Sequence, residues 1–227
     1  RRCRPRAAFW RLQRTGKRGV MDHKVRAQAL LGRVIPVGVN IADDVALERS
    51  YAALRAEHGP VQILVNCGGT IFRAPAHEFP MSEWHKVIAV NLDAAFLLSQ
   101  LLGAEMIKRQ SGKIINIASM LSYSGGITVP AYTASKHAIT GLTKALANEW
   151  ASKGVNVNAI APGYIETDNT YALRNDPDRS TSILQRIPAN RWGIPSDFAG
   201  PAIFLASDAA NYVHGTILTV DGGWMGR

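Results

Sequence analysis

The 227 residues suit one domain, and an apolar content of 47% is enough to bury a sizeable core. Two cysteines, Cys3 and Cys67, exclude a disulfide framework and favour a reducing compartment, so we expect a cytoplasmic protein. No apolar run reaches the roughly 18 residues that a membrane-spanning helix needs, and we therefore expect no membrane segment.

The net charge of +9 is carried by the first 26 residues, which hold ten Lys or Arg residues and Asp22 as the one acidic residue. The remainder is neutral, with 16 basic and 16 acidic residues. Such a basic arm is interpreted as a nucleic-acid or membrane-surface tail, as a targeting peptide, or as a misassembled start, since the first Met is Met21. We favour the last interpretation. We do not expect the arm to bind nucleic acid, because no basic face recurs later.

A dinucleotide-binding α/β protein opens with an apolar strand and a glycine-rich turn into a helix. The nearest candidate here is Thr15–Gly19, but the preceding Trp10–Arg14 is not an apolar strand and no third glycine follows. We interpret this candidate as a chance match and predict that residues 1–24 form no strand–turn–helix unit. The domain is then expected over residues 27–227, after a basic arm over residues 1–26.

The segment Gly32–Ile41 has the pattern of a strand, and Asp44–His58 has the spacing of an amphipathic helix that ends at Gly59. Asn40 lies at the end of the strand. Its side chain either caps the following helix together with Asp43, or accepts a hydrogen bond from a ligand through its amide oxygen. Both alternatives stay open.

The run Val61–Asn66 is typical of a central parallel strand. After it, Gly68 and Gly69 let the backbone approach a ligand closely. Cys67 between them and the strand is best explained as a small buried filler, because a redox role lacks a partner thiol.

Ser82 is predicted to cap a long helix that contains Asn91. Asn is a mediocre helix former. The Asn91 side chain therefore either faces outward or holds a water in a local distortion of the helix.

The segment that organises the chain begins with Lys113–Ala118, a short buried strand with Ser119 at its C-terminal end, where open α/β sheets place ligands. A helix is predicted from Pro130, and Tyr132 and Lys136 lie four residues apart on one of its faces. We expect this face to turn back toward the strand end that holds Ser119.

These three side chains can perform a specific proton transfer. A tyrosine with a pKa of roughly 10 is a poor base at neutral pH, but the Lys136 ammonium group is expected to favour the phenolate of Tyr132 and lower that pKa. The Ser119 hydroxyl can hold a carbonyl or alcohol oxygen. Because no side chain carries a hydride, the trio implies a nicotinamide cofactor, NAD or NADP.

After this segment, Val155–Ile160 is predicted as a strand that Pro162 and Gly163 end. The polar stretch Glu166–Arg191, interrupted by prolines, is predicted to be a mobile lid over the substrate. The chain then ends with a helix from Ser196 or Asp197 to near Ser207 and a last strand over Thr216–Val220.

The trio resembles the active site of the short-chain dehydrogenase/reductase family, and further motifs match that family in the right order. They are Leu64–Gly69, Asn91, Pro162-Gly163 with Thr167, and Val220–Gly223. The resemblance implies a Rossmann-like doubly wound parallel α/β sheet, here apparently lacking the first two strands and the glycine-rich turn. It implies Ser119, Tyr132, Lys136 and Asn91 as catalytic residues, with Asn91 anchoring a proton relay for Lys136. It implies no metal, and its cofactor contacts are Asn40, Ile41, Asn66, Cys67, Gly68, Tyr132, Lys136, Pro162, Gly163, Ile165 and Thr167.

Within the family, the chain from Ile114 onward looks most like the sugar-acid dehydrogenases of the gluconate and 2-deoxy-gluconate type, which interconvert a hydroxyl and a ketone. A sugar-acid substrate has a carboxylate that calls for an Arg or Lys. The candidates are Arg73, Arg174, Arg186 and Arg191.

The resemblance also implies a homo-oligomer, a dimer or a tetramer, in which the helices around Asn91 and Tyr132–Trp150 pack across a two-fold axis. A different function class stays open. The chain could be a truncated family member with lost dinucleotide binding, inactive or serving as an oligomer partner. Binding of NADH distinguishes the two classes.

Overall fold

A computed structural model of the protein describes residues 12–13 and 35–227. The chain divides into two compact units, residues 1–59 and residues 60–227. The predicted domain boundary at residue 26 and the glycines of Thr15–Gly19 lie outside the described residues, so both stay predictions.

The first unit contains β1 (Leu12–Gln13), which pairs in parallel with β2 (Val37–Gly38). The Leu12–Gln13 pair lies in a segment that was not expected to form a strand. The strand forms because these two residues pair with β2. A partner strand can thus fix a strand that its own apolar pattern does not predict.

The helix α2 (Asp44–His58) follows in the first unit, with the predicted bounds. The Asp43 side chain caps it by accepting from the Ala46 N–H at 3.0 Å. The Asn40 side chain accepts from the Ala42 N–H at 3.3 Å. Asn40 therefore closes the turn before the helix, and Asp43 alone is its cap.

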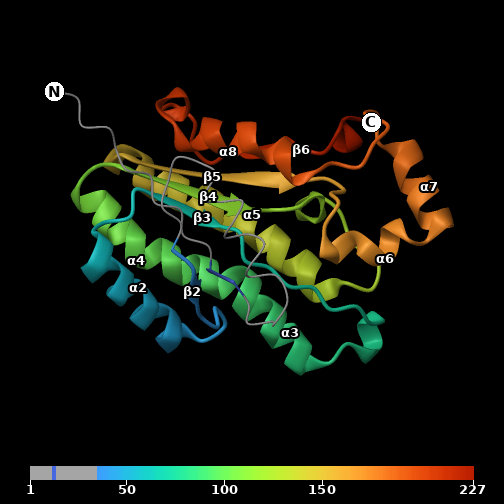
Figure 1. The fold of residues 1–227 in the computed structure, drawn as a ribbon, viewed down its shortest axis with the longest axis horizontal. Coiled ribbons are helices and arrows are strands. Elements are labelled where there is room, and N and C mark those ends of the chain that lie inside the picture. Colours follow the sequence, from blue (N-terminus) through green and yellow to red (C-terminus); the bar gives the residue numbers. More distant parts are fainter. Residues whose placement is uncertain (1–11, 14–34) are drawn as a thin grey trace. The chain divides into compact units, whose positions relative to one another are not determined.

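The second unit is built on a four-stranded, all-parallel sheet in the order β3-β4-β5-β6 (Figure 1). These strands are β3 (Ile63–Asn66), β4 (Gly112–Ile117), β5 (Val155–Pro162) and β6 (Ile217–Val220). Each falls on a predicted apolar run. In β5 every residue except the last is buried, as expected for a strand covered on both faces.

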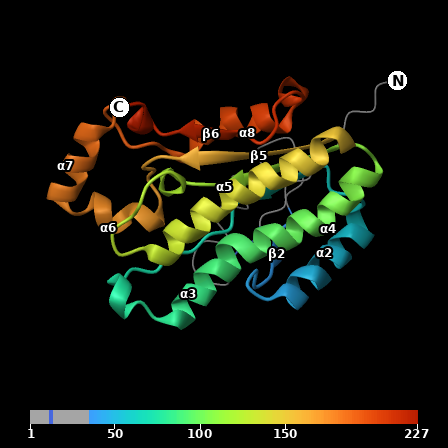
Figure 2. The same cartoon turned by 180° about the vertical axis from the view of Figure 1, so that it is seen from behind.

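Helices cover both faces of this sheet, which confirms the doubly wound α/β architecture for the second unit. On one face lie α4 (Ala94–Lys108) and α5 (Pro130–Trp150), side by side in front of the sheet in Figure 2. Their apolar residues and those of the sheet form one cluster around Ala95, Ile139 and Ala159. On the other face, Leu205 of α8 (Ala199–Ala206) packs on Ile115 and Ile160.

The predicted long helix is interrupted. It consists of α3 (Met81–Ile88), the π-helical segment η2 (Ala89–Asp93) and α4. It begins after Pro80, and no side chain caps it, so the prediction that Ser82 is the cap was wrong. The 28 residues Met81–Lys108 are long and apolar enough to cross a membrane by length and composition. Here Leu102 and Met106 of this helix are buried in the second unit, as in the core helix of a globular domain.

The predicted lid contains two helices, α6 (Tyr171–Arg174) and α7 (Pro177–Arg186). Ile183 and Ile187 are buried together with Trp192, and Trp224 packs against them. The structure thus gives this segment an apolar anchor, and its movement stays a prediction. The remaining short helical turns are η1 (Ala76–Glu78), η3 (Met120–Ser122), η4 (Ala151–Lys153), η5 (Asp168–Thr170), η6 (Pro195–Phe198), η7 (Asp208–Ala210) and η8 (Trp224–Gly226).

Candidate active site

Ser119 lies two residues after the end of β4, at the carboxyl edge of the sheet. Its hydroxyl accepts a hydrogen bond from the Leu121 N–H at 3.2 Å, and its own N–H donates to the Ser122 hydroxyl at 3.3 Å. This reciprocal capping of η3 fixes the Ser119 side chain at the strand end.

The helix α5 starts with Pro130 in its first turn, a position that proline favours because its missing N–H has no helical partner there. Tyr132 and Lys136 follow one turn apart, and the Lys136 Nζ lies 5.6 Å from the centre of the Tyr132 ring. The Tyr132 hydroxyl is hydrogen-bonded to Ser119. The structure therefore brings together the three residues that the sequence predicted as a unit.

Two hydrogen bonds fasten α5 to the strand end. The Ser122 hydroxyl donates to the Lys136 carbonyl at 2.6 Å, and the Lys136 ammonium group donates to the Ile117 carbonyl at 2.7 Å. Lys136 is only 4% exposed. Its orientation is thus set by the last residue of β4, next to Ser119.

The pKa values of the pair follow from burial. Burial raises the pKa of the Tyr132 phenol, while the hydrogen bond from Ser119 and the nearby Arg73 guanidinium lower it to a smaller extent. Burial lowers the pKa of Lys136 to about 8. The expected net lowering of the Tyr132 pKa was therefore wrong for this structure, because the loss of solvation outweighs the nearby charges. At neutral pH the phenol is protonated and able to donate.

Asn91 lies in the π-helical segment η2 and is 2% exposed. Its amide oxygen accepts from the Thr70 N–H at 2.8 Å, and its amide nitrogen donates to the Thr70 carbonyl and to the Ser135 hydroxyl, each at 3.0 Å. The predicted local distortion is confirmed and the outward orientation is wrong. Asn91 contacts α5 through Ser135. Its part in a proton relay to Lys136 stays a prediction.

Asn66 has a structural contact set that the sequence did not reveal. Its amide nitrogen donates to the Asn116 side-chain oxygen at 2.8 Å and to the Ser99 hydroxyl at 3.2 Å, and the Asn116 amide donates to the Thr143 hydroxyl at 2.9 Å. This buried polar chain joins β3, β4, α4 and α5. The sequence feature that could have indicated this chain is a single Asn in each of two apolar runs, at positions that pair between β3 and β4.

Cys67 is exposed, so its interpretation as a buried filler was wrong. It follows Asn66, whose side chain points into the domain, and successive side chains in an extended chain point to opposite sides. Gly68 and Gly69 after it are also exposed. This strand end, close to Ser119 across the β3–β4 pairing, leaves backbone accessible to a ligand.

The loop after β5 lies at the same edge of the sheet. The Gly163 N–H donates to the Val220 carbonyl at 3.0 Å, and a side chain at Gly163 would place its Cβ 2.6 Å from the Asp221 Cα. The Thr167 N–H donates to the Thr170 hydroxyl at 3.1 Å, and Thr167 is the N-cap of η5. The predicted cofactor residues Pro162, Gly163, Ile165 and Thr167 therefore form one ordered turn there.

These residues fit a dinucleotide, since an exposed glycine pair and an ordered loop flank Ser119 at the carboxyl ends of parallel strands. Asn40 and Ile41 lie in the first unit, in the turn before α2. Their contact with a cofactor stays a prediction.

Two of the four candidate arginines for a substrate carboxylate are already engaged. Arg191 forms a bidentate ion pair with Asp197 at 2.7 and 2.9 Å, which lowers the pKa of the Asp197 carboxyl to about 2. The Arg186 guanidinium stacks on the Trp224 ring, 4.1 Å from its centre.

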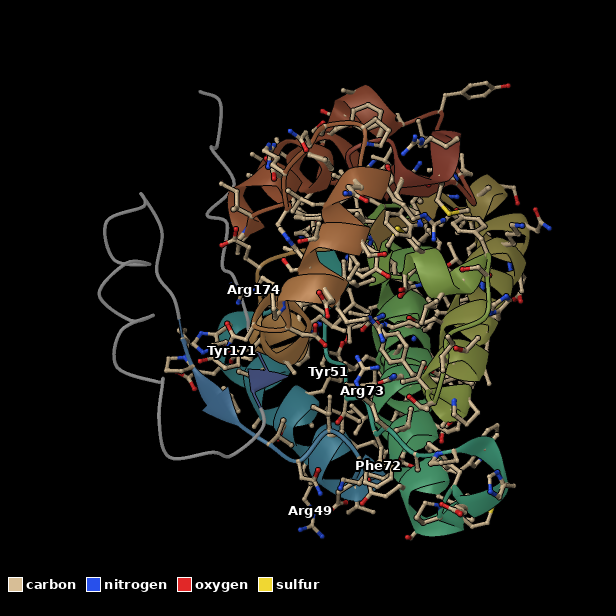
Figure 3. All side chains as sticks on the ribbon, turned by 90° about the vertical axis from the view of Figure 1, so that its right-hand side faces the viewer. Arg49, Tyr51, Phe72, Arg73, Tyr171 and Arg174 are labelled. Carbon is tan, nitrogen blue, oxygen red and sulfur yellow. The ribbon has the colours of Figure 1, made fainter. Side chains whose placement is uncertain are left out.

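The other two are labelled in Figure 3. Arg174 donates to the Thr167 carbonyl at 3.4 Å and lies beside Tyr171 of the same helix, 6.0 Å from the ring centre (Figure 3). Arg73 lies between β3 and α3, is exposed, and forms no hydrogen bond or ion pair with any of the described residues.

Comparison with known proteins gives consistent matches. A family model described as enoyl-(acyl carrier protein) reductase matches residues 12–225. The 2-dehydro-3-deoxy-D-gluconate 5-dehydrogenase of Pseudoalteromonas atlantica is 61% identical over 188 residues, which are 83% of this chain and 74% of that protein.

Solved structures agree with the sequence matches. A putative NAD(P)-dependent gluconate 5-dehydrogenase from Beutenbergia cavernae, with bound NADP, superposes with a TM-score of 0.87 at 50% identity, over 92% of this chain and 83% of that one. A gluconate 5-dehydrogenase from Burkholderia cenocepacia, in complex with NADP and tartrate, gives a TM-score of 0.89 at 35% identity, over 97% and 86% of the two chains.

Proposed function

Because this chain belongs to the short-chain dehydrogenase/reductase family, we propose that it interconverts a hydroxyl and a ketone on a sugar acid with NADP or NAD as cofactor. The observation that carries the proposal is the hydrogen bond between Ser119 and Tyr132, with Lys136 one helical turn further on. The name of the Pseudoalteromonas relative supports a substrate such as 2-dehydro-3-deoxy-D-gluconate, and the bound NADP of the solved neighbours supports that cofactor.

The side chains divide the proton chemistry among them. The Ser119 hydroxyl, fixed by its capping contacts, holds the oxygen of the substrate carbonyl or alcohol. Tyr132 donates its phenolic proton to that oxygen in the reductive direction, and its raised pKa keeps the proton available at neutral pH. A bound nicotinamide supplies or accepts the hydride.

Lys136 stabilises the phenolate that remains on Tyr132 after this donation. Its ammonium group is held 5.6 Å from the ring by the Ile117 carbonyl, and it carries its charge below a pKa of about 8. The proton of Tyr132 is restored from solvent or from Lys136. In the oxidative direction the same groups act in reverse.

We assign cofactor contacts to the strand-end backbone at Cys67 and Gly68 and to the loop residues Pro162, Gly163, Ile165 and Thr167. At Asn66 we assign the cofactor contact to the backbone, because the side chain is hydrogen-bonded to Asn116 and Ser99. The two turns flank Ser119 on β3 and β5, the neighbours of β4.

The test is turnover by the purified chain. Reduced nicotinamide formation is followed with D-gluconate and with 3-deoxy-D-gluconate derivatives, each with NADP and with NAD, and binding of NADPH and NADH is measured separately by fluorescence. Turnover of a sugar acid supports the proposal. If neither cofactor binds, the chain is instead a family member without dinucleotide binding, inactive or serving as an oligomer partner.

We further propose a homo-oligomer, a dimer or tetramer, in the cytoplasm. Phe96 on α4 is 45% exposed, as expected for an apolar residue that a second copy covers. Light scattering at micromolar concentration should give a mass above that of the 24.6 kDa monomer. A monomeric mass would exclude the oligomer without affecting the proposed chemistry.

A further inference from the structure

We propose that Arg191 and Asp197 are positioning residues, whose ion pair fixes the backbone of Gly193 and, through it, the backbone of Ile165 for the nicotinamide half of the cofactor. The inference rests on the proposed function, which assigns a cofactor contact to Ile165. It adds to that function two residues that touch neither substrate nor cofactor and act through the loop after β5.

Gly193 pairs with Ile165 in a short parallel bridge. The Gly193 N–H donates to the Tyr164 carbonyl, and the Glu166 N–H donates to the Gly193 carbonyl, each at 2.9 Å. The approach is close, because a Cβ on Gly193 would lie 2.6 Å from Cδ1 of Ile165. The backbone of Gly193 therefore determines where the backbone on both sides of Ile165 lies.

The bridge also sets the direction of the Ile165 peptide groups. A residue bracketed by two such bonds in a parallel pairing turns its own N–H and carbonyl away from the partner. The Ile165 carbonyl accepts a hydrogen bond from the Thr170 hydroxyl. Among the described residues none accepts from the Ile165 N–H, so this donor remains for a ligand.

Ile165 lies where the reacting end of the cofactor is expected. It follows β5, which is the neighbour of β4, and Ser119 lies just after the end of β4. The nicotinamide ring must meet the substrate carbon whose oxygen Ser119 and Tyr132 hold. The part of the cofactor beside Ile165 is therefore the nicotinamide half.

The ion pair holds Gly193 from both sides. Arg191 donates to the Asp197 carboxylate at 2.7 and 2.9 Å, and the Ile194 N–H donates to the same carboxylate at 2.8 Å. Arg191 also donates to the Trp192 carbonyl at 3.1 Å. The residues before and after Gly193 are thus tied to one carboxylate, in the bidentate geometry that makes an ion pair strong.

Side-chain packing alone does not hold this bridge. A cavity of about 230 Å³ is lined by Ile165, Gly193, Arg191 and Asp197 among others. Because the space beside the bridge is not filled by side chains, its position depends on the hydrogen bonds and on the ion pair. Loss of either charged partner should therefore let Gly193 and Ile165 shift.

The experiment measures binding by isothermal titration calorimetry with wild type, Arg191→Gln, Asp197→Asn and the double variant. The ligands are NADPH and NADH, and the same molecules without the nicotinamide ring, 2′-phospho-ADP-ribose and ADP-ribose. These fragments keep every phosphate of the cofactor. The controls are Lys153→Gln and Glu149→Gln, which remove the same charges from an exposed ion pair in the last turn of α5 and the turn after it.

We expect Arg191→Gln and Asp197→Asn each to weaken dinucleotide binding about threefold to thirtyfold and to leave fragment binding within about twofold of wild type. The double variant should lose no more than the larger single loss, because the two residues act as one clamp. Arg191→Lys should lose less than Arg191→Gln, because it keeps the charge without the bidentate geometry. Both controls should match wild type.

Direct attraction of the cofactor phosphates by Arg191 is the competing explanation. It requires opposite effects, weaker binding in Arg191→Gln and tighter binding in Asp197→Asn, and it requires the fragment to change as much as the dinucleotide. Either result would overturn the inference. Dinucleotide binding that is unchanged in either single variant would overturn it as well.

Binding also separates this inference from the proposed function. If wild type binds a dinucleotide but turns over no sugar acid, the proposed function fails, and the ratio of dinucleotide to fragment affinity still decides about the ion pair. If wild type turns over a sugar acid and both single variants bind the dinucleotide as wild type does, the proposed function stands and the ion pair is excluded. If wild type binds neither dinucleotide, both fail.

Discussion

The side-chain amide of Asn91 donates a hydrogen bond to the hydroxyl of Ser135 over 3.0 Å. Ser135 in turn donates to the backbone carbonyl of Tyr132 at 2.7 Å. The π-helical segment is thus connected through one serine to the backbone of the proton donor. π-helical segments are rare in proteins overall, but those that occur are often at functional sites. Here the extra residue of the π-helical turn directs Asn91 toward α5.

We expect this connection to be energetically coupled. Asn91→Ala leaves the Thr70 N–H and carbonyl without that partner and should lower the free energy of unfolding by about 2–3 kcal/mol, whereas Ser135→Ala should cost about 1 kcal/mol. The double variant should cost less than the sum by about 0.5–1 kcal/mol. Urea unfolding of the four proteins measures the difference. Strict additivity would show that the bond between the two side chains contributes nothing.

Lys136 gives the stability a defined dependence on pH. The pKa of Lys136 is about 8 in the folded protein and 10.5 in the unfolded chain, so the unfolded state binds more protons between these two pH values. The cost of burying the charge is therefore fully present below pH 8 and disappears as the pH rises toward 10.5. The shift corresponds to about 3 kcal/mol.

In Lys136→Met this contribution is absent. The difference in unfolding free energy between the variant and wild type should therefore change over the range from pH 7 to pH 10.5, with wild type gaining relative to the variant. The slope is the readout, because the variant also leaves the Ile117 carbonyl without its donor at every pH. Lys108→Met, at an exposed position, should show no such slope. A constant difference for Lys136→Met would contradict the lowered pKa.

The helix pair that supports the site is closely packed at one glycine. A Cβ on Gly103 of α4 would lie 2.7 Å from two ring atoms of Trp150, which ends α5. Gly103→Ala should therefore lower the free energy of unfolding by about 1–3 kcal/mol. At Gly141 of α5 a Cβ meets nothing within 4 Å, so Gly141→Ala should raise stability by about 0.5–1 kcal/mol. Equal effects of the two changes on the melting temperature would show that the packing of α4 on α5 is looser than described.

The parts of the fold that follow from local pattern were predicted well. The apolar runs predicted the four strands of the second unit, Asp44–His58 was predicted with both bounds, and α5 was predicted with its start at Pro130. At helix Met81–Lys108 the predicted start was wrong, and the inward orientation of Asn91 was one of two alternatives that the sequence left open. The hydrophobic pattern of a helix does not show where a polar side chain will find a partner in another element.

The candidate site was predictable to the extent that its residues carry chemistry at fixed spacing. Ser119, Tyr132 and Lys136 meet as expected, but the balance between burial and charge that raises the pKa of Tyr132 needed the packed environment. The exposure of Cys67 and the buried contacts of Asn66 depend on which way each side chain points at a strand end. One residue of register reverses that direction, and the sequence alone left it open.

The most direct measurement is the turnover of Tyr132→Phe beside that of Tyr123→Phe, with a sugar acid and NADP. Both changes remove one phenolic hydroxyl. That of Tyr132 is hydrogen-bonded to Ser119, whereas that of the exposed Tyr123 donates to the Ile217 carbonyl at 3.4 Å. We predict that Tyr132→Phe loses at least about a hundredfold in kcat at an unchanged melting temperature, and that Tyr123→Phe stays within about threefold of wild type. Turnover by Tyr132→Phe at the level of Tyr123→Phe would contradict the assignment of Tyr132 as the proton donor, and with it the proposed mechanism.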